Sequence, residues 1–396
     1  MLPSIPMIDD VLSSLSALPH RLSTTPSERR AAEYLREKLS RLSLEAEVEP
    51  LVAPTTFSWI YFLLYLGFLL AVAVGFYHPY VGFPVALLTA FLFIGEQTTL
   101  YTPLSNWVPQ GLSHNVSARI PAAGKLANTL CLVAHYDTSK TALIFHPRGV
   151  KGLRSAFLVS LAMIALILAG TLALIFLPGL AAKIVKWALF VPAAYMGIMC
   201  LGMLERELRG VPVNGASDNA TGVAIVIELA RRIKEQGGLR GWEVIVLLTG
   251  SEEVGLAGMA HFLREKAELL DRPRTVFLNF DNVGGGRVNY VRAEGMLYHL
   301  GGDPVLLSIA DELTRVDPRF RDVRSRVFDA LTLDTLVPAA RGYRVLTIMG
   351  LNEDGVPYPW HWFNDTLENV DRSVTRLAAE FGWELISRLV ASTPSD

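Results

Sequence analysis

Hydrophobic and polar positions follow two different patterns in different parts of the chain. Uncharged apolar runs lie at 57–76, 81–95, 155–178 and 187–204. Because a helix of about 20 apolar residues crosses the hydrocarbon core of a bilayer, these runs predict about four transmembrane helices. The last two form a hairpin, with Lys183 and Lys186 in a short basic turn between them.

Shorter periodic segments fill the rest of the chain. Pro26 opens an amphipathic helical pattern that continues to Leu42, and TLCLVA is an apolar strand at 129–134. After Gly210, strand and helix patterns alternate: helices at 219–236, 255–270, 305–316 and 373–389, and strands at 242–250, 275–281 and 343–350. Such alternation predicts an α/β fold in which a largely parallel sheet carries helices on both faces.

Composition supports a membrane protein and excludes one class of partner. Hydrophobic residues make up 51% of the 396 residues and charged residues 19%, and the mean hydropathy is +0.34. The net charge of −2 lacks the basic excess that neutralises nucleic-acid phosphates, so we expect no nucleic-acid partner. Cys131 and Cys200 lie far apart in apolar runs and suggest no disulfide.

Polar residues follow the predicted strands where each strand ends. His135 and Asp137 follow the strand at 129–134, and Glu252 and Glu253 follow the strand at 242–250. Asp281 closes the strand at 275–281, His361 comes after the strand at 343–350, and Asp218 opens the helix at 219–236. In open α/β sheets ligands bind at the carboxyl ends of the strands, so these side chains are expected to converge.

Two histidines and several carboxylates form a ligand set suited to zinc and related divalent ions, and shared carboxylates can hold two metals. Each residue also has a structural interpretation. His135 and Asp281 fit a structural histidine and a turn residue, Asp218 fits a helix cap, and the Glu252–Glu253 pair fits a solvated loop. His361 lies between Trp360 and Trp362, where it fits a packing role.

The motifs in this order resemble the zinc aminopeptidases of peptidase family M28 and their carboxypeptidase relatives. The matching segments are HYD at 135–137, SDNATG at 217–222, SEEVGLAG at 251–258, FDNVG at 280–284 and HWFNDTLENV at 361–370. The resemblance covers the N-terminal helix and roughly residues 115–140 and 210–392, and leaves out the apolar runs. It implies a three-layer α/β/α zinc-peptidase domain with a mostly parallel, mixed sheet.

The resemblance also implies a role for each residue. His135 and Asp281 would bind one zinc ion, Glu253 and His361 a second, and Asp218 would bridge the two. Asp137 would hold the imidazole of His135 in place, and Glu252 would be the general base.

One position departs from the family pattern. Many members carry a tyrosine immediately before the last ligand histidine, and here Trp360 occupies that position. Tyr358 is close in sequence and could replace its hydroxyl. Asp334 falls where the family often has another acidic residue.

The chemistry constrains the topology. His135 and Asp218 must meet, so the chain between them crosses the bilayer an even number of times. We therefore expect the catalytic domain to consist of residues 1–54, 109–150 and 209–396, interrupted by hairpins at 55–108 and 151–208. Six basic residues flank the second hairpin on the catalytic side: Lys140, Arg148, Lys151, Arg154, Arg206 and Arg209. These residues, together with the lack of a signal-peptide pattern at the N-terminus, favour a cytoplasmic catalytic domain.

The sequence thus predicts a multi-pass membrane dizinc metallopeptidase that acts on peptides, most simply as an aminopeptidase. A glutaminyl cyclase or a carboxypeptidase of the same family is an alternative. A non-catalytic ion- or peptide-binding membrane protein is another, but it would require charges within the spans, and these runs have almost none.

Overall fold

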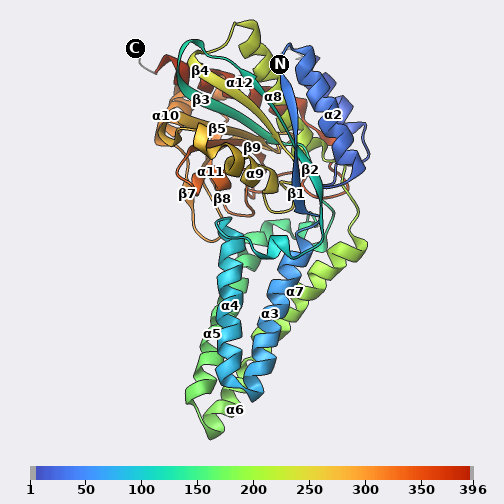
Figure 1. Cartoon of the computed structure of the whole chain (residues 1–396), viewed down its shortest axis with the longest axis vertical. Coiled ribbons are helices and arrows are strands. Elements are labelled where there is room, and N and C mark those ends of the chain that lie inside the picture. The colour runs from blue at the N-terminus through green and yellow to red at the C-terminus, as the bar shows by residue number, and fades with distance from the viewer. Residues whose placement is uncertain (1–5, 393–396) are drawn as a thin grey trace. The chain divides into compact units, whose positions relative to one another are not determined.

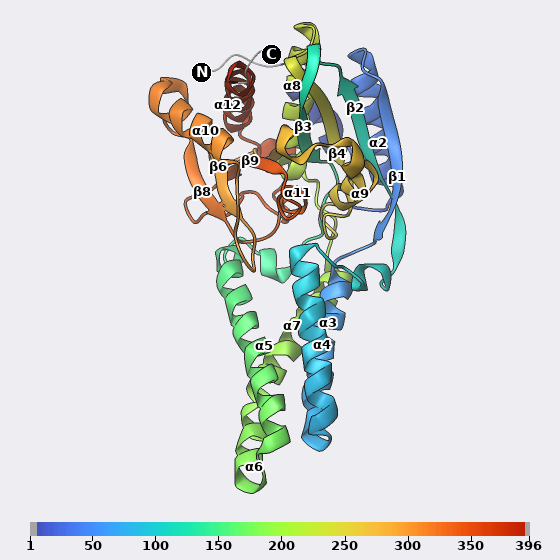
Figure 2. The same cartoon turned by 60° about the vertical axis from the view of Figure 1, so that its left-hand side comes forward.

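The computed structural model describes residues 6–392, and its chain divides into two compact units. Within the described residues, unit 1 contains residues 6–55, 110–141 and 211–392, and unit 2 contains residues 56–109 and 142–210. Both units appear in Figures 1 and 2. Unit 2 is therefore formed by two insertions into the chain of unit 1.

A single mixed sheet is the centre of unit 1. Within the described residues it has nine strands in the order β1-β2-β4-β3-β5-β9-β6-β7, with β8 paired to β6. The strands are β1 Ala46–Pro54, β2 Gln110–Ile120, β3 Ala123–His135, β4 Arg240–Thr249, β5 Thr275–Asp281, β6 Arg287–Glu294, β7 Leu300–Gly301, β8 Arg324–Phe328 and β9 Arg344–Leu351. The central strands β4, β3, β5 and β9 are parallel, so their carboxyl ends lie at one edge.

Helices cover both faces of this sheet. They are α1 Pro6–Ser16, α2 Pro26–Arg41, α8 Thr221–Glu235, α9 Ala257–Lys266, α10 Pro304–Val316, α11 Leu336–Ala339 and α12 Arg372–Ala391. Because side chains alternate along a strand, β3 sends Leu130 and Leu132 into a core with α1, α2, α8, α10 and α12. Its Cys131 and Val133 point into a second core with α9 and α11. The α/β fold class expected from the sequence is confirmed.

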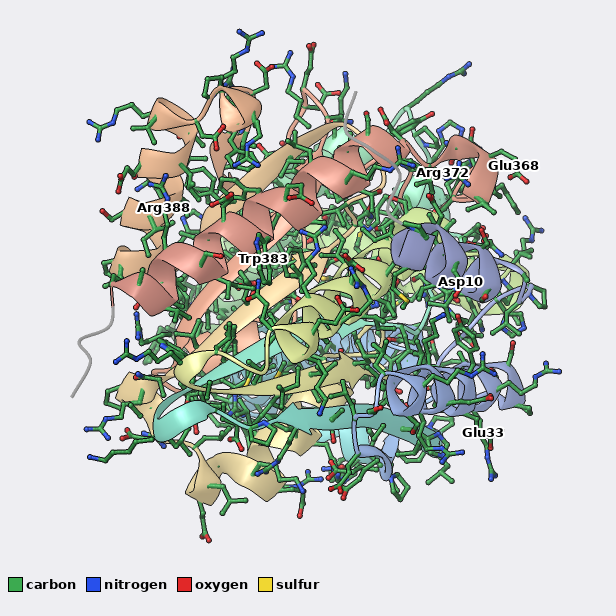
Figure 3. All side chains as sticks on the ribbon, turned by 90° about the horizontal axis from the view of Figure 1, so that it is seen from above. Asp10, Glu33, Glu368, Arg372, Trp383 and Arg388 are labelled. Carbon is green, nitrogen blue, oxygen red and sulfur yellow. The ribbon has the colours of Figure 1, made fainter. Side chains whose placement is uncertain are left out.

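Polar contacts join α1, α8 and α12, which pack into the same core. These helices are seen from above in Figure 3. Arg372 on α12 forms an ion pair of 3.1 Å with Asp9 on α1. Arg232 on α8 bonds Glu380 on α12 at 2.7 Å, and its guanidinium lies 5.7 Å from the centre of the Trp383 ring. These pairs connect α12 to α1 and to α8, the helix that follows the irregular segment Ala216–Ala220.

Unit 2 consists of long apolar helices. These are α3 Ser58–Tyr77, α4 Pro79–Thr98, α5 Leu153–Phe176, α6 Gly179–Ala188 and α7 Phe190–Arg209. Four segments of the described chain are long and apolar enough to cross a membrane: Ser58–Tyr77, Pro79–Thr98, Val150–Phe176 and Gly179–Arg209.

The predicted basic turn of the second hairpin is wrong. Lys183 and Lys186 lie within α6, and the chain reverses at Leu177 and Pro178. Proline lacks the backbone N–H that would continue α5, whereas Gly179–Ala188 contains no helix-breaking residue after its first position. Two lysines three residues apart are as compatible with the polar face of a helix as with a turn.

Candidate metal centre

The parallel strands bring the predicted site residues to one edge of the sheet. His135 is the last residue of β3 and Asp281 the last of β5, and β3 and β5 are neighbours. Glu252 and Glu253 follow β4, which pairs with the other side of β3. All four side chains are at least nine-tenths buried. The sheet order therefore places residues that are far apart in sequence next to one another.

Asp218 lies between the two histidines. It belongs to an irregular turn, Ala216–Ala220, immediately before α8. Its Oδ1 is 3.1 Å from Nε2 of His135, and its Oδ2 is 2.9 Å from Nε2 of His361. A single carboxylate thus directs one oxygen to each imidazole.

The remaining ligand atoms complete two groups around Asp218. Nε2 of His135 is 3.5 Å from Oδ1 of Asp281, and Nε2 of His361 is 2.9 Å from Oε1 of Glu253. In each group, the ligand atoms of the two carboxylates and the histidine lie within 4.8 Å of one another. A carboxylate oxygen of Glu252 also lies within 4.8 Å of ligand atoms of His135 and Glu253.

The chemistry of this donor set fits a metal ion. Oδ2 of Asp218 and Oε1 of Glu253 are buried, and both face the same nitrogen, Nε2 of His361, at 2.9 Å. Buried carboxylates are normally paired or coordinate a metal. Imidazole nitrogens and carboxylate oxygens are ordinary zinc ligands, and in each group they converge within 4.8 Å of one another.

Burial and mutual repulsion disfavour ionisation of most carboxylates in the cluster. Burial raises the pKa of Glu252, Glu253 and Asp281, and neighbouring carboxylates raise each further. Burial would also raise the pKa of Asp218, but hydrogen bonds with His135 and His361 outweigh it and hold that pKa below its usual range. A divalent cation would favour the ionised form of all four groups.

Asp137 connects the histidine strand to the glutamate turn. Its carboxylate accepts the backbone N–H of Glu252 at 3.0 Å and of Glu253 at 3.2 Å. Nδ1 of His135 lies 3.3 Å from the carbonyl oxygen of Asp137 and 3.6 Å from Oδ1. Ser251, with φ of 56°, turns the backbone so that both N–H groups face this carboxylate.

His361 comes from a loop after β9. Its backbone has φ of 46°, a conformation that non-glycine residues rarely adopt, and its side chain is buried. The ring of Trp360 is also buried and lies 5.1 Å from the imidazole ring, whereas Tyr358 is half exposed.

Two further buried acidic residues lie beside the site. Asp365 accepts the backbone N–H of Ser217 at 2.6 Å and of Asp218 at 3.2 Å. Asp334 accepts a hydrogen bond of 2.5 Å from Thr249 at the end of β4. Each gave a signal in the sequence: Asp365 lies four residues after His361, and Asp334 falls where the family often has another acidic residue.

Comparison with known proteins agrees with this geometry. Residues 201–386, a little under half of the chain, match the sequence model of peptidase family M28. The match covers Asp218, Glu252, Glu253, Asp281 and His361. It supports a peptidase-like hydrolase, and the family resemblance expected from the motifs is confirmed.

Solved structures share the fold at low sequence identity. A zinc aminopeptidase from Bacillus subtilis has a TM-score of 0.56 at 13% identity, covering 97% of this chain and 95% of that one. A glutaminyl cyclase from an Acidobacteriales bacterium has a TM-score of 0.56 at 14% identity, covering 98% and 96%. LapB from Legionella pneumophila has a TM-score of 0.54 at 13% identity, covering 97% and 71%. No curated protein sequence matches the chain.

Proposed function

We propose that this protein is a membrane-embedded dizinc aminopeptidase that hydrolyses short peptides. The observation that carries the proposal is the carboxylate of Asp218, whose two oxygens face the two histidines of two separate ligand groups. An ordinary helix cap would direct its oxygens to backbone N–H groups instead. The family match and the zinc aminopeptidase with the same fold support this choice of chemistry.

Each ligand group would hold one zinc ion. His135 and Asp281 would bind the first, Glu253 and His361 the second, and Asp218 both. Asp137 would fix the orientation of His135 through its contacts at Nδ1. Zinc, when bound, activates a water molecule and polarises the scissile carbonyl.

Glu252 would transfer the proton. Its carboxylate lies beside the ligands, its backbone N–H is held by Asp137, and burial raises its pKa. A carboxylate in this position accepts a proton from the attacking water and donates it to the leaving amine. Glu253, the next residue, contacts His361, so the adjacent glutamates have separate tasks.

The apolar helices of unit 2 would anchor the enzyme in the bilayer as a multi-pass protein. All four candidate spans meet the length and hydropathy that a membrane helix requires. The basic residues that flank the second hairpin favour a cytoplasmic catalytic unit. Labelling an epitope tag at the C-terminus in intact and permeabilised cells tests the side; labelling of intact cells would place the catalytic unit outside.

The function is tested by zinc analysis together with product release. The purified chain should bind two zinc ions and release N-terminal amino acids from short peptides. Glu252→Gln should keep the zinc and lower kcat by about 10² to 10⁴, the range of a lost general base, whereas Glu253→Gln should lose zinc. Full activity of Glu252→Gln would contradict the mechanism.

A substrate panel separates the related activities. A peptide with N-terminal glutamine that cyclises without releasing an amino acid would indicate a glutaminyl cyclase, whose fold is equally similar. Release of the C-terminal residue would indicate a carboxypeptidase. The full five-residue ligand set favours a peptidase over a glutaminyl cyclase, which usually works with one zinc ion.

A further inference from the structure

The short segment Arg21–Thr24, between α1 and α2, lies next to three loops that carry candidate ligands. Its Arg21 and Ser23 are buried, with 0% and 1% of their surface exposed. The segment precedes the residues that match the family, and its sequence gives no sign of a site. Its contacts are therefore a separate source of information about the metal centre.

Arg21 holds the loop that contains His135 and Asp137. Its Nε donates a hydrogen bond of 2.7 Å to the carbonyl oxygen of Tyr136, the residue between them. Its backbone N–H donates to Oγ1 of Thr138 at 3.0 Å, and its carbonyl accepts the N–H of Thr138 at 3.2 Å. Both the main chain and the side chain of Arg21 thus form hydrogen bonds with this loop.

The same guanidinium holds the loop that leads to Asp218. Nη1 donates to the carbonyl oxygen of Asn214 at 2.8 Å, and Nη2 donates to that of Gly215 at 2.7 Å. Gly215 has φ of 70°, and a Cβ there would lie 2.9 Å from Nη2 of Arg21 and 2.3 Å from Cγ2 of Thr138. The two loops can approach closely because residue 215 is a glycine, which has no Cβ to clash with Arg21 or Thr138.

Ser23 extends these contacts to the glutamate turn. Its hydroxyl hydrogen-bonds that of Ser251, the left-handed residue directly before Glu252 and Glu253. The segment thus reaches the loops after β3 and β4 and the loop before α8.

A guanidinium suits this task better than an ammonium group. Its planar fork of N–H donors binds several carbonyl oxygens at once, which a lysine cannot do in the same geometry. Burial lowers the pKa of Arg21 to about 10, so the group remains charged at neutral pH. The negative charges of Asp365, Asp137 and Asp218 oppose that shift, so these carboxylates favour the charged form of the guanidinium.

We propose that Arg21 is a positioning residue of the metal centre, which ties the His135 loop to the Asp218 loop and so sets the separation of their ligand atoms. The inference rests on the proposed dizinc function. Arg21 acts through the backbone of the loops, because its guanidinium donates to the carbonyl oxygens of Tyr136, Asn214 and Gly215.

The test measures zinc affinity of the full chain in detergent by competition with a chelator. Arg21→Met should bind zinc about 10- to 100-fold more weakly, the range for residues that orient ligands. Arg21→Lys keeps the charge but loses the fork, so it should be intermediate. Arg29→Met, an exposed arginine on α2 paired with Glu33, should match the wild type.

The outcomes separate this inference from the function on which it rests. Wild-type affinity in Arg21→Met, even with a lower melting temperature, would show that Arg21 only stabilises the fold. If Arg21→Met does not fold, wild-type affinity in Arg21→Lys overturns the inference instead. A wild-type chain that binds no zinc would refute the proposed function itself.

Discussion

At the scale of single residues, the shared carboxylate of Asp218 gives the clearest distinction between one metal site and two. Asp218→Asn removes a charged ligand from both groups, so we predict that the chain then holds less than one zinc ion. His361→Ala disrupts only the group with Glu253 and should leave about one ion with His135 and Asp281. Zinc analysis after dialysis measures both.

The exposed Asp311→Asn, far from the site in sequence and paired with Arg292, is the matched control and should keep both ions. Equal zinc loss in Asp218→Asn and His361→Ala would contradict a shared ligand.

Glu28 gives a prediction about pH. Burial and the nearby Asp137 raise its pKa from 4.5 to about 8. Between these values the folded chain keeps a proton that the unfolded chain releases. The stability that this proton contributes is therefore present below about pH 4.5 and is lost as the pH rises to about 8.

Glu28→Gln keeps the site neutral, so its melting temperature should fall less than that of the wild type between about pH 5 and about pH 8. The comparison uses chelator-treated protein, and Glu33→Gln, on the exposed side of the same helix, is the control. Parallel profiles for wild type and Glu28→Gln would show that Glu28 does not carry this effect.

The sequence predicted which residues gather at the site better than it predicted what supports them. His135, Glu252, Glu253 and Asp281 follow apolar strands, and parallel strands end at one edge. Arg21 binds backbone carbonyls from loops more than 100 residues away. Every residue has a backbone carbonyl, so the residue types of these loops give no sign of the contact. Its role becomes visible only in three dimensions.

At the scale of elements, the turn between β4 and α9 positions the two glutamates through close backbone packing. Asn115 on β2 accepts the N–H of Gly250 at 3.2 Å and donates to the carbonyl of Gly258 at 2.8 Å. A Cβ on Gly258 would lie 2.2 Å from the carbonyl oxygen of Gly250. The start of α9 is thus pressed against the end of β4.

Gly258→Ala should therefore destabilise the chain by about 1–3 kcal/mol, the cost of overpacking, and weaken zinc binding by moving the glutamate turn. Thermal unfolding and zinc affinity measure the two effects. Gly301→Ala is the control, because a Cβ there meets no atom within 4 Å. Unchanged behaviour of Gly258→Ala would show that the turn accommodates the methyl group.

Periodicity predicted the longer helices of unit 1 and the central strands because these bury a regular face, but it did not predict α11, and α6 was predicted to be a turn. It missed β2, β6 and β8, which mix exposed and buried positions. Such a strand is stabilised by pairing with strands that are distant in sequence, so its own hydrophobic pattern is weak.

At the scale of the whole molecule, each insertion leaves unit 1 and re-enters it at residues that are neighbours in space. Pro54 pairs with Gln110 across β1 and β2, and the N–H of Thr141 donates to the carbonyl of Val211 at 2.9 Å. Each insertion therefore begins and ends where two segments of unit 1 already pair. Sequence analysis predicted two hairpin insertions, but the pairing that closes them required the structure.

We predict that residues 56–109 and 142–210 can each be replaced by a short turn of about two to four residues. The shortened chain should fold without detergent and bind as much zinc as the full chain. Circular dichroism and zinc analysis test this, with Asp218→Asn in the same shortened chain as control. A soluble, folded chain without zinc would show that unit 2 is needed for the metal centre.

Anomalous diffraction at the zinc absorption edge, on crystals of the full chain, tests the central claim most directly. The account predicts two peaks about 3.5–4 Å apart, one beside His135 and Asp281 and one beside Glu253 and His361, with Asp218 between them. A single peak, or peaks away from these side chains, would contradict it.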